Sequence, residues 1–144
     1  MNSPDKKTTM KTKKIIAIIE ASSTGFGIYS DDLPGITGYG ATIEKAKEDL
    51  MDAIEDILES HQEDGTTSPS FLSHSIEFIY KYDIASIFAH FGMLDATNFA
   101  KRIKLNPSLL RQYKSGHALA SDKQKKKIET GLHELGRELL SVQL

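Results

Sequence analysis

The period of the hydrophobic pattern changes near Asp83, and this change limits the folds that the chain can adopt. Before it, short apolar segments rich in β-branched and aromatic residues alternate with turns that contain Gly, Ser or Pro, which is typical of strands. After it, apolar residues recur only at helical spacing. We therefore expect an α+β protein, with a small sheet in its first half and an all-α second half.

The first half is predicted to fold in the order β-β-β-α-β. Strands are expected over residues 14–20, 26–30, 36–39 and 76–82. A helix begins after Thr42, a favourable N-cap, and it carries one apolar face with which it is expected to pack on the sheet. That face consists of Ile43, Ala46, Leu50, Ala53, Ile54 and Ile57.

Capping residues divide the second half into four helices. Two short helices are expected over residues 84–91 and 95–104. A third, over residues 106–116, opens with an Asn cap followed by Pro at the first helical position, a favourable pairing. A long last helix follows the cap Ser121.

Charge is divided unevenly between the two halves. Residues 1–83 carry 8 Lys and Arg against 15 Asp and Glu, a net charge of −7, whereas residues 84–144 carry 10 against 5, a net charge of +5. An acidic module repels nucleic acid and a basic one can approach it. We expect a flexible tail over residues 1–12, a first domain over 13–83 and a second domain over 84–144.

Several classes of protein are excluded by composition. The chain has no Cys, which removes disulfide scaffolds, Cys-ligated zinc, iron–sulfur clusters and thiol catalysis. The longest apolar run, residues 15–19, is far shorter than the roughly 20 residues that span a bilayer. The polar N-terminus carries no signal-peptide pattern, so we expect a soluble, cytoplasmic protein without membrane contact.

The two short helices between residues 95 and 115 match the size and punctuation of a helix-turn-helix. Their apolar positions are expected to form its core: Phe99, Ala100, Ile103, Leu105, Leu110 and Tyr113. Arg can read guanine and Gln adenine in the major groove, while Lys and helix N-termini hold phosphates. The candidate DNA-binding residues are Lys101, Asn106, Ser108, Arg111, Gln112 and Lys114. A lysine run over residues 123–127 can add phosphate contacts or be a solvated helix start.

This segment resembles the Cro-type helix-turn-helix. The resemblance rests on the apolar-Ala pair Phe99-Ala100, on Leu105 in the turn and on the closing pair Ser115-Gly116. One position departs from that pattern, because Lys104 stands where such proteins usually have Gly. That position often takes a positive φ, which is costly for a residue with a Cβ, so we expect a slightly altered turn.

The first half resembles the HicB antitoxin family. The resemblance rests on Asp32-Leu33-Pro34-Gly35 and on Thr42-Ile43-Glu44-Lys45-Ala46, and it covers about residues 13–83. It implies a partial RNase H-like domain that binds a small basic HicA-type toxin, an mRNA-cleaving ribonuclease with a catalytic His. It further implies that the chain blocks this toxin and represses the shared operon, binding double-stranded operator DNA through the helix-turn-helix.

Acidic residues of the first half are the candidates for binding such a partner. They can mimic the charge of nucleic acid toward a basic, RNA-binding protein. The candidate toxin-binding residues are Asp31, Asp32, Glu48, Asp52, Glu55 and Asp56.

Two other functions remain open at this point. One is a stand-alone transcriptional repressor whose first domain dimerises or senses a ligand. The other is a metal-dependent nuclease with a targeting helix-turn-helix, for which Asp31, Asp32 and Glu48 are carboxylates of the right type. No spacing shows that these three converge, and the five His are scattered. We therefore expect no enzymatic activity, no catalytic residue, no cofactor and no bound metal.

Helix-turn-helix proteins usually bind paired half-sites as dimers, so we expect a homodimer or a higher homo-oligomer. One candidate interface is an edge strand of the sheet. The other is the apolar side of the last helix, formed by Leu132, Leu135, Leu139 and Val142.

Overall fold

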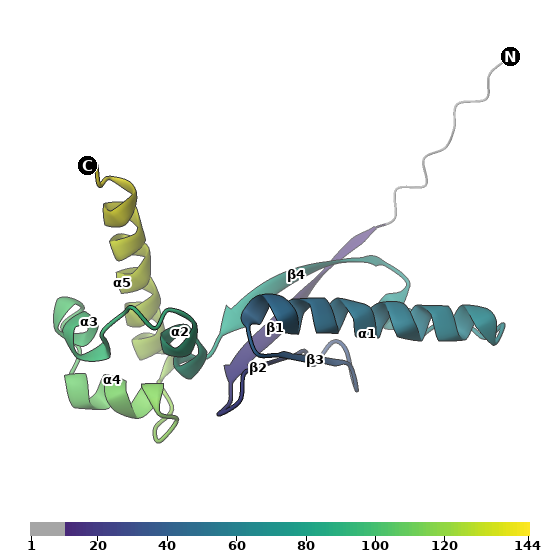
Figure 1. Cartoon of the computed structure of the whole chain (residues 1–144), viewed down its shortest axis with the longest axis horizontal. Coiled ribbons are helices and arrows are strands. Elements are labelled where there is room, and N and C mark those ends of the chain that lie inside the picture. Colours follow the sequence, from purple (N-terminus) through teal and green to yellow (C-terminus); the bar gives the residue numbers. More distant parts are fainter. Residues whose placement is uncertain (1–10) are drawn as a thin grey trace, which may run out of the picture. The chain divides into compact units, whose positions relative to one another are not determined.

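The computed structural model describes residues 11–144, so the first ten residues of the predicted tail lie outside the described residues. The chain is α+β, with a four-stranded mixed sheet and five α-helices among the described residues (Figure 1). It divides between Asp83 and Ile84 into two compact units. No helix within residues 11–144 has both the length and the apolar character needed to cross a membrane.

The sheet of the first unit has the strand order β3-β2-β1-β4. The two hairpin connections make β2 antiparallel to both β1 and β3, whereas β4 returns after a helix and pairs parallel with β1. The parallel pairing of β1 with β4 requires a crossover connection, which the helix provides. The strands are β1 (Thr12–Ala21), β2 (Phe26–Tyr29), β3 (Thr37–Gly40) and β4 (Ser75–Tyr82).

Strand β1 is longer than predicted. Thr12 pairs with Ser75 at the start of β4, so residue 12 belongs to the sheet and not to a flexible tail. The prediction was wrong here because Thr12 and Lys13 are polar, and it is the distant partner strand that holds them extended. Element limits elsewhere differ from the predictions by at most two residues.

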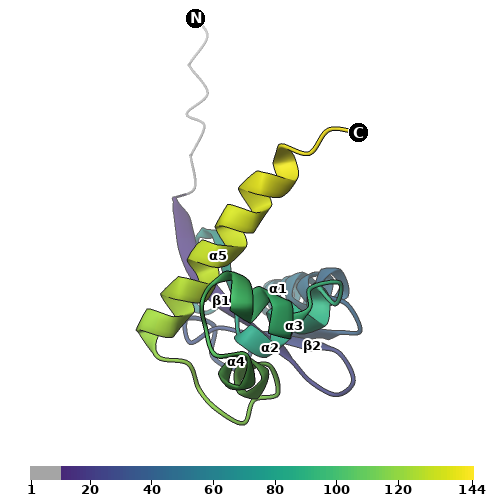
Figure 2. The same cartoon turned by 90° about the vertical axis from the view of Figure 1, so that its left-hand side faces the viewer.

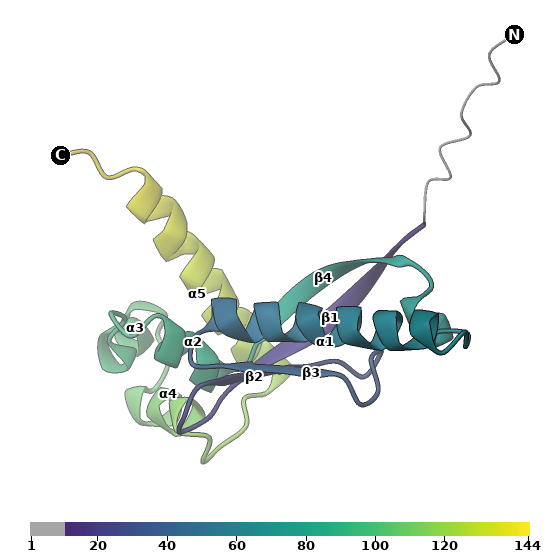
Figure 3. The ribbon, with the colours of Figure 1, turned by 45° about the vertical axis from the view of Figure 1, so that its right-hand side comes forward.

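Helix α1 (Ile43–Glu63) lies along one face of this sheet (Figure 3). The Thr42 side chain caps it by accepting a hydrogen bond from the Lys45 backbone N–H at 3.2 Å. Alternate residues of β1 face the helix, and Ile15, Ala17 and Ile19 are fully buried. The predicted apolar face of α1 is confirmed: Ile43, Ala46, Leu50 and Ile54 are buried in the same core, with Ala53 and Ile57 partly buried against it.

Two glycines allow α1 to approach β3 closely. A Cβ at Gly38 would lie 2.3 Å from the carbonyl oxygen of Ala46 and 2.7 Å from the Cβ of Leu50. A Cβ at Gly40 would lie 2.5 Å from the backbone nitrogen of Ala46. Both positions therefore exclude any side chain unless the helix moves. A short 3₁₀ turn, η1 (Ser70–Leu72), follows α1 and adds Leu72 to the core.

The second unit contains four helices (Figure 2). Two caps are those predicted: the Asn106 side chain accepts from Ser108 N–H at 2.8 Å, and Ser121 accepts from Gln124 N–H at 3.2 Å. Asp95, predicted as the first residue of its helix, instead caps it, and its carboxylate accepts from Asn98 N–H at 2.8 Å. The helices are α2 (Ile84–His90), α3 (Ala96–Arg102), α4 (Pro107–Lys114) and α5 (Asp122–Leu140).

The core of this unit is formed by the apolar residues predicted from their spacing, with three additions. Phe99, Ala100, Leu105, Leu110 and Tyr113 are buried, and Ile103 is partly buried against them. Phe88 of α2, Ala96 of α3 and Ile128 of α5 complete the cluster. All four helices therefore share one apolar core.

Lys104 adopts the left-handed conformation in the connection between α3 and α4. Its φ is 57°, and it is the only non-glycine residue with positive φ within residues 11–144. Lys104 therefore takes the left-handed conformation itself, and the strain of that conformation falls on this residue.

Replacing Lys104 by Gly is expected to stabilise the second unit by about 0.5–1 kcal/mol, because relief of the Cβ crowding outweighs the extra freedom of the unfolded chain. Thermal and denaturant unfolding followed by circular dichroism measures this. Lys104→Ala is the matched control, since it removes the same long side chain and keeps the Cβ. If Ala stabilises as much as Gly, the gain comes from removing the charge and not from the backbone.

Candidate functional site

Helix α4 is anchored by its apolar side and presents its polar side to solvent. Leu110 is fully buried and Tyr113 is nearly so, and both pack into the core of the second unit. Pro107 occupies the first turn after the Asn106 cap. The six residues predicted to contact DNA are all exposed: Lys101 on α3, Asn106 at the cap, and Ser108, Arg111, Gln112 and Lys114 on α4.

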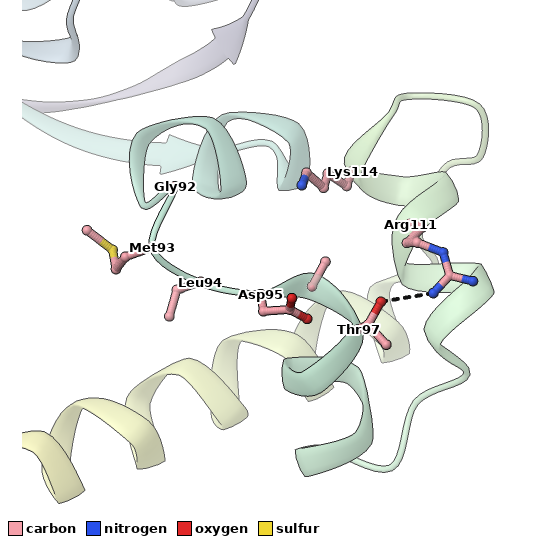
Figure 4. Close-up of a pocket in the computed structure, with 8 residues that line it drawn as sticks. Gly92, Met93, Leu94, Asp95, Thr97, Arg111 and Lys114 are labelled. Carbon is pink, nitrogen blue, oxygen red and sulfur yellow. Dashed lines mark hydrogen bonds between the residues drawn. The ribbon is translucent and has the colours of Figure 1, made fainter.

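The side chain of Arg111 is held by a residue of α3 that the sequence did not indicate. The Arg111 Nη1 donates a hydrogen bond to Thr97 Oγ1 of α3 at 2.9 Å (Figure 4). Thr97 lies 14 residues before Arg111 in the chain. Local spacing carries no information on such a contact, so Thr97 could be found only once the packing of α3 against α4 was known.

The lysine run at the start of α5 is only partly free to bind an anion. The Lys127 Nζ donates to the carbonyl oxygen of Lys104 at 2.8 Å, which ties α5 to the connection before α4. Lys126 pairs with Glu129 at 3.2 Å. Within residues 11–144, Lys123 and Lys125 form no ion pair, so these two are the ones available for phosphate contacts.

The apolar residues of α5 divide into two groups. Leu132 and Leu135 pack against the core of the second unit, whereas Leu139 and Val142 are exposed. An ion pair between Arg102 and Glu138 fastens α5 to α3. The C-terminal part of α5 extends past the three shorter helices (Figure 2). Of the four residues predicted as an interface, only the last two are therefore available to a partner.

The predicted acidic residues fall on two different elements of the first unit. Glu48, Asp52, Glu55 and Asp56 are exposed on α1, and their spacing of three and four residues places them on one face, opposite the buried side. Asp31 and Asp32 are exposed in the turn after β2. There the Asp32 backbone N–H donates to Ser30 Oγ at 3.2 Å. The structure therefore places four of the six on one face of α1 and the other two on a separate element, the turn after β2.

A neighbouring acidic residue has a structural role. The Asp49 carboxylate accepts a hydrogen bond from the backbone N–H of Tyr39 at 2.8 Å. Because β3 is an edge strand, this N–H has no strand partner on its outer side. Asp49 thus satisfies the sheet edge and does not belong to the exposed acidic face.

The face of the sheet opposite α1 carries partly exposed apolar side chains that the sequence did not point to. Ile16 and Ile79 are register neighbours on β1 and β4, and their side chains are 44% and 42% exposed. Tyr39 on β3 is 51% exposed. Burial raises the pKa of Tyr29 on this face, and so does the hydrogen bond that its hydroxyl donates to Glu20 at 3.1 Å.

Aromatic residues of β4 line the other face, beneath α1. Lys47 of α1 places its Nζ 4.2 Å from the centre of the Tyr80 ring, and Phe78 stacks on the same ring. Burial raises the pKa of Tyr80, with a smaller contribution from Tyr82. These contacts hold α1 on the sheet and leave its acidic side outward.

No group of three or more His, Asp or Glu side chains within residues 11–144 is arranged to hold a metal ion. Asp31, Asp32 and Glu48, the carboxylates considered for a nuclease centre, are among the residues searched. No family model, no curated protein and no solved structure matches this chain.

Proposed function

We propose that the chain is an antitoxin of the HicB type. Its first unit binds and blocks a small basic ribonuclease of the HicA type, and its second unit represses the shared operon by binding operator DNA. The observation that carries the proposal is the pairing of two surfaces in one chain: an exposed acidic face on α1, and an exposed polar and basic face on α4. Each surface belongs to a unit with its own core.

The order of elements supports the fold part of the proposal. The first unit runs β1-β2-β3-α1-β4, which is the order expected of a partial RNase H-like domain. The turn at residues 32–35 joins β2 to β3, and residues 42–46 open α1, so the two segments that resemble HicB antitoxins stand at the limits of regular elements. The arrangement of α3 and α4 supports a helix-turn-helix, because a capped α4 follows a turn closed by a left-handed residue.

The acidic face of α1 supports a basic partner. Complementary charge accelerates encounter and favours the correct partner over others. Glu44, Glu59 and Glu63 are also exposed on α1 and extend its negative charge. A protein that binds RNA must itself present positive charge to phosphates, so such a face fits the RNA-binding surface of a small ribonuclease.

Neutralising the acidic face of α1 is expected to slow association with the ribonuclease about tenfold or more at low salt. The variant is Glu48→Gln/Asp52→Asn/Glu55→Gln/Asp56→Asn, which keeps the shape of each side chain. Surface plasmon resonance measures the association rate, and residual RNA cleavage at equal concentrations measures the loss of inhibition.

Two controls make this test specific. Glu129→Gln/Glu134→Gln removes exposed acidic charge from the second unit and is expected to leave the rate unchanged. Asp31→Asn/Asp32→Asn is expected to have a smaller effect than the α1 variant, because the turn after β2 is a separate element. Equal association rates for wild type and the α1 variant would show that the partner does not meet this face.

A stand-alone repressor is the second candidate, and the exposed neighbouring pair Ile16 and Ile79 is the observation that favours it. Exposed apolar patches mark association surfaces, and a first unit that only dimerises would use this pair. The two functions separate cleanly: only the antitoxin requires a tight protein partner other than a second copy. In both cases we propose that the DNA-bound form is a homodimer or a higher homo-oligomer on paired half-sites.

A further inference from the structure

A hollow of about 350 Å³ lies beside α4 in the second unit (Figure 4). Residues 92–97, which connect α2 to α3 and open α3, form one wall, and Arg111 and Lys114 of α4 form the other. Two cationic side chains therefore border one small space that is open to solvent.

The position of Arg111 on α4 separates it from its neighbour Gln112. Successive residues of a helix are rotated by about 100°, so residues three apart share a side whereas adjacent ones do not. Arg111 and Lys114, three residues apart, both border the hollow, and Gln112 does not. Ser108 lies one turn before both Arg111 and Gln112, and it does not border the hollow either. The exposed surface of α4 thus has two parts: a cationic side toward the α2–α3 connection and an uncharged polar side.

The guanidinium of Arg111 is held at the hollow by a neutral group. Its Nη1 donates to Thr97 Oγ1 at 2.9 Å, and the other guanidinium donors remain for a ligand. A hydroxyl acceptor orients the side chain without cancelling its charge, as a carboxylate partner would. Neither Arg111 nor Lys114 forms an ion pair with any residue in the described range 11–144.

One acidic residue, Asp95, also lines the hollow. Its carboxylate accepts a hydrogen bond from the backbone N–H of Asn98 at 2.8 Å and so caps α3. The hollow therefore has two positive side chains and one negative side chain, and the negative one is engaged by the helix start. The net positive charge of these side chains favours an anionic ligand. Guanidinium donors together with an ammonium suit phosphate oxygens.

We propose that this hollow binds a phosphodiester of the DNA backbone, with Arg111 and Lys114 as its contacts and Thr97 as the residue that positions Arg111. Arg111 is then a backbone contact and not a reader of guanine, and base discrimination falls to the uncharged side of α4, Ser108 and Gln112. This inference rests on the proposed function of the second unit, and it specifies which residues of α4 contact the DNA backbone and which discriminate bases.

The test compares two DNA probes across a series of salt concentrations, using the full chain. One probe is a duplex selected by the wild type from a random pool, and the other is a scrambled duplex. Arg111→Ala is expected to weaken binding to both probes by a similar factor, and to reduce the slope of log K against log salt by about 1. Gln112→Ala is expected to weaken only the selected duplex. Fluorescence anisotropy measures all of these affinities.

Thr97 variants test positioning separately from charge. Thr97→Val keeps the side-chain shape and loses the acceptor, so binding to both probes is expected to weaken about threefold to tenfold. Thr97→Ser restores the acceptor and is expected to bind as the wild type does. Arg137→Ala is the charge control, because it removes an exposed Arg near the end of α5. It is expected to weaken binding to the two probes less than Arg111→Ala does. Melting curves establish that each variant is folded.

The possible outcomes separate this inference from the function on which it rests. If the wild type binds neither duplex, both are overturned. If it binds and Arg111→Ala relaxes the preference for one base pair with an unchanged salt slope, Arg111 reads a base and only this inference is overturned. Inorganic phosphate, replacing chloride at constant ionic strength, tests for a free anion by NMR. If phosphate shifts the NMR signals of Thr97 and Arg111, and Arg111→Ala leaves the salt slope unchanged, the hollow binds a free anion. That result would overturn the assignment to DNA.

Discussion

Replacing Arg111 and Gln112 together by Ala is expected to remove most of the selectivity for operator DNA and to weaken all DNA binding. The two side chains are exposed on α4, and a good side-chain contact to a base contributes about 1–3 kcal/mol of discrimination. Loss of Gln112 should therefore lower the affinity ratio between the selected duplex and a scrambled one by roughly tenfold to a hundredfold, and loss of the Arg111 phosphate contact should weaken binding to both. Competition binding with the two labelled duplexes measures this ratio.

A double variant elsewhere in the second unit controls for the loss of one positive charge and one side-chain amide. Arg137→Ala/Gln143→Ala removes the same two residue types from exposed positions near and beyond the end of α5, and it is expected to retain the wild-type ratio. If the Arg111/Gln112 variant binds one sequence as selectively as the wild type, α4 is not the recognition helix.

Replacing Gly38 by Ala is expected to destabilise the first unit by about 3 kcal/mol, the upper range for overpacking a core. The new Cβ would lie 2.3 Å from a backbone oxygen of α1, and neither strand nor helix can relieve this with a side-chain rotation. The melting temperature of that unit should fall by roughly 15 °C. Thermal unfolding followed by circular dichroism, with NMR to assign the transition, measures the change.

Gly27→Ala is the matched control, since Gly27 lies on the neighbouring strand and a Cβ there meets no atom within 4 Å. It should leave stability unchanged or raise it slightly, because Ala restricts the unfolded chain more than Gly does. A Gly38→Ala variant as stable as the Gly27→Ala variant would mean that α1 does not approach β3 as closely as described.

The predictions that succeeded from sequence are those with local causes. Thr42, Asn106 and Ser121 cap helices through side-chain contacts within three residues, so the sequence alone locates those helix starts. The cores followed from helical spacing and strand alternation for the same reason. At Lys104 the missing Gly led us to expect a slightly altered turn, whereas the structure shows Lys104 itself with positive φ.

The features that the sequence did not reveal depend on contacts between distant residues. Thr12 is extended because it pairs with Ser75, and Asp49 is engaged because an edge N–H of Tyr39 faces it. Thr97 meets Arg111 only after α3 packs on α4. The sequence placed Asp49 with Glu48 and Asp52 by helical spacing, and only the packing of α1 beside β3 shows that Asp49 is engaged at the sheet edge. Charge composition therefore predicted the character of the candidate surfaces and not their limits.

The most direct test of the proposed antitoxin is a calorimetric titration of the full chain with the HicA-type ribonuclease that the proposal places in the same operon, paired with an RNA-cleavage assay. We expect tight, stoichiometric binding with complete loss of cleavage at equivalence, and much slower association for the α1 variant. Full cleavage in the presence of excess chain, with no heat of binding, would contradict it. If operator binding persisted in that case, the second unit would still act as a repressor and the first would need another role.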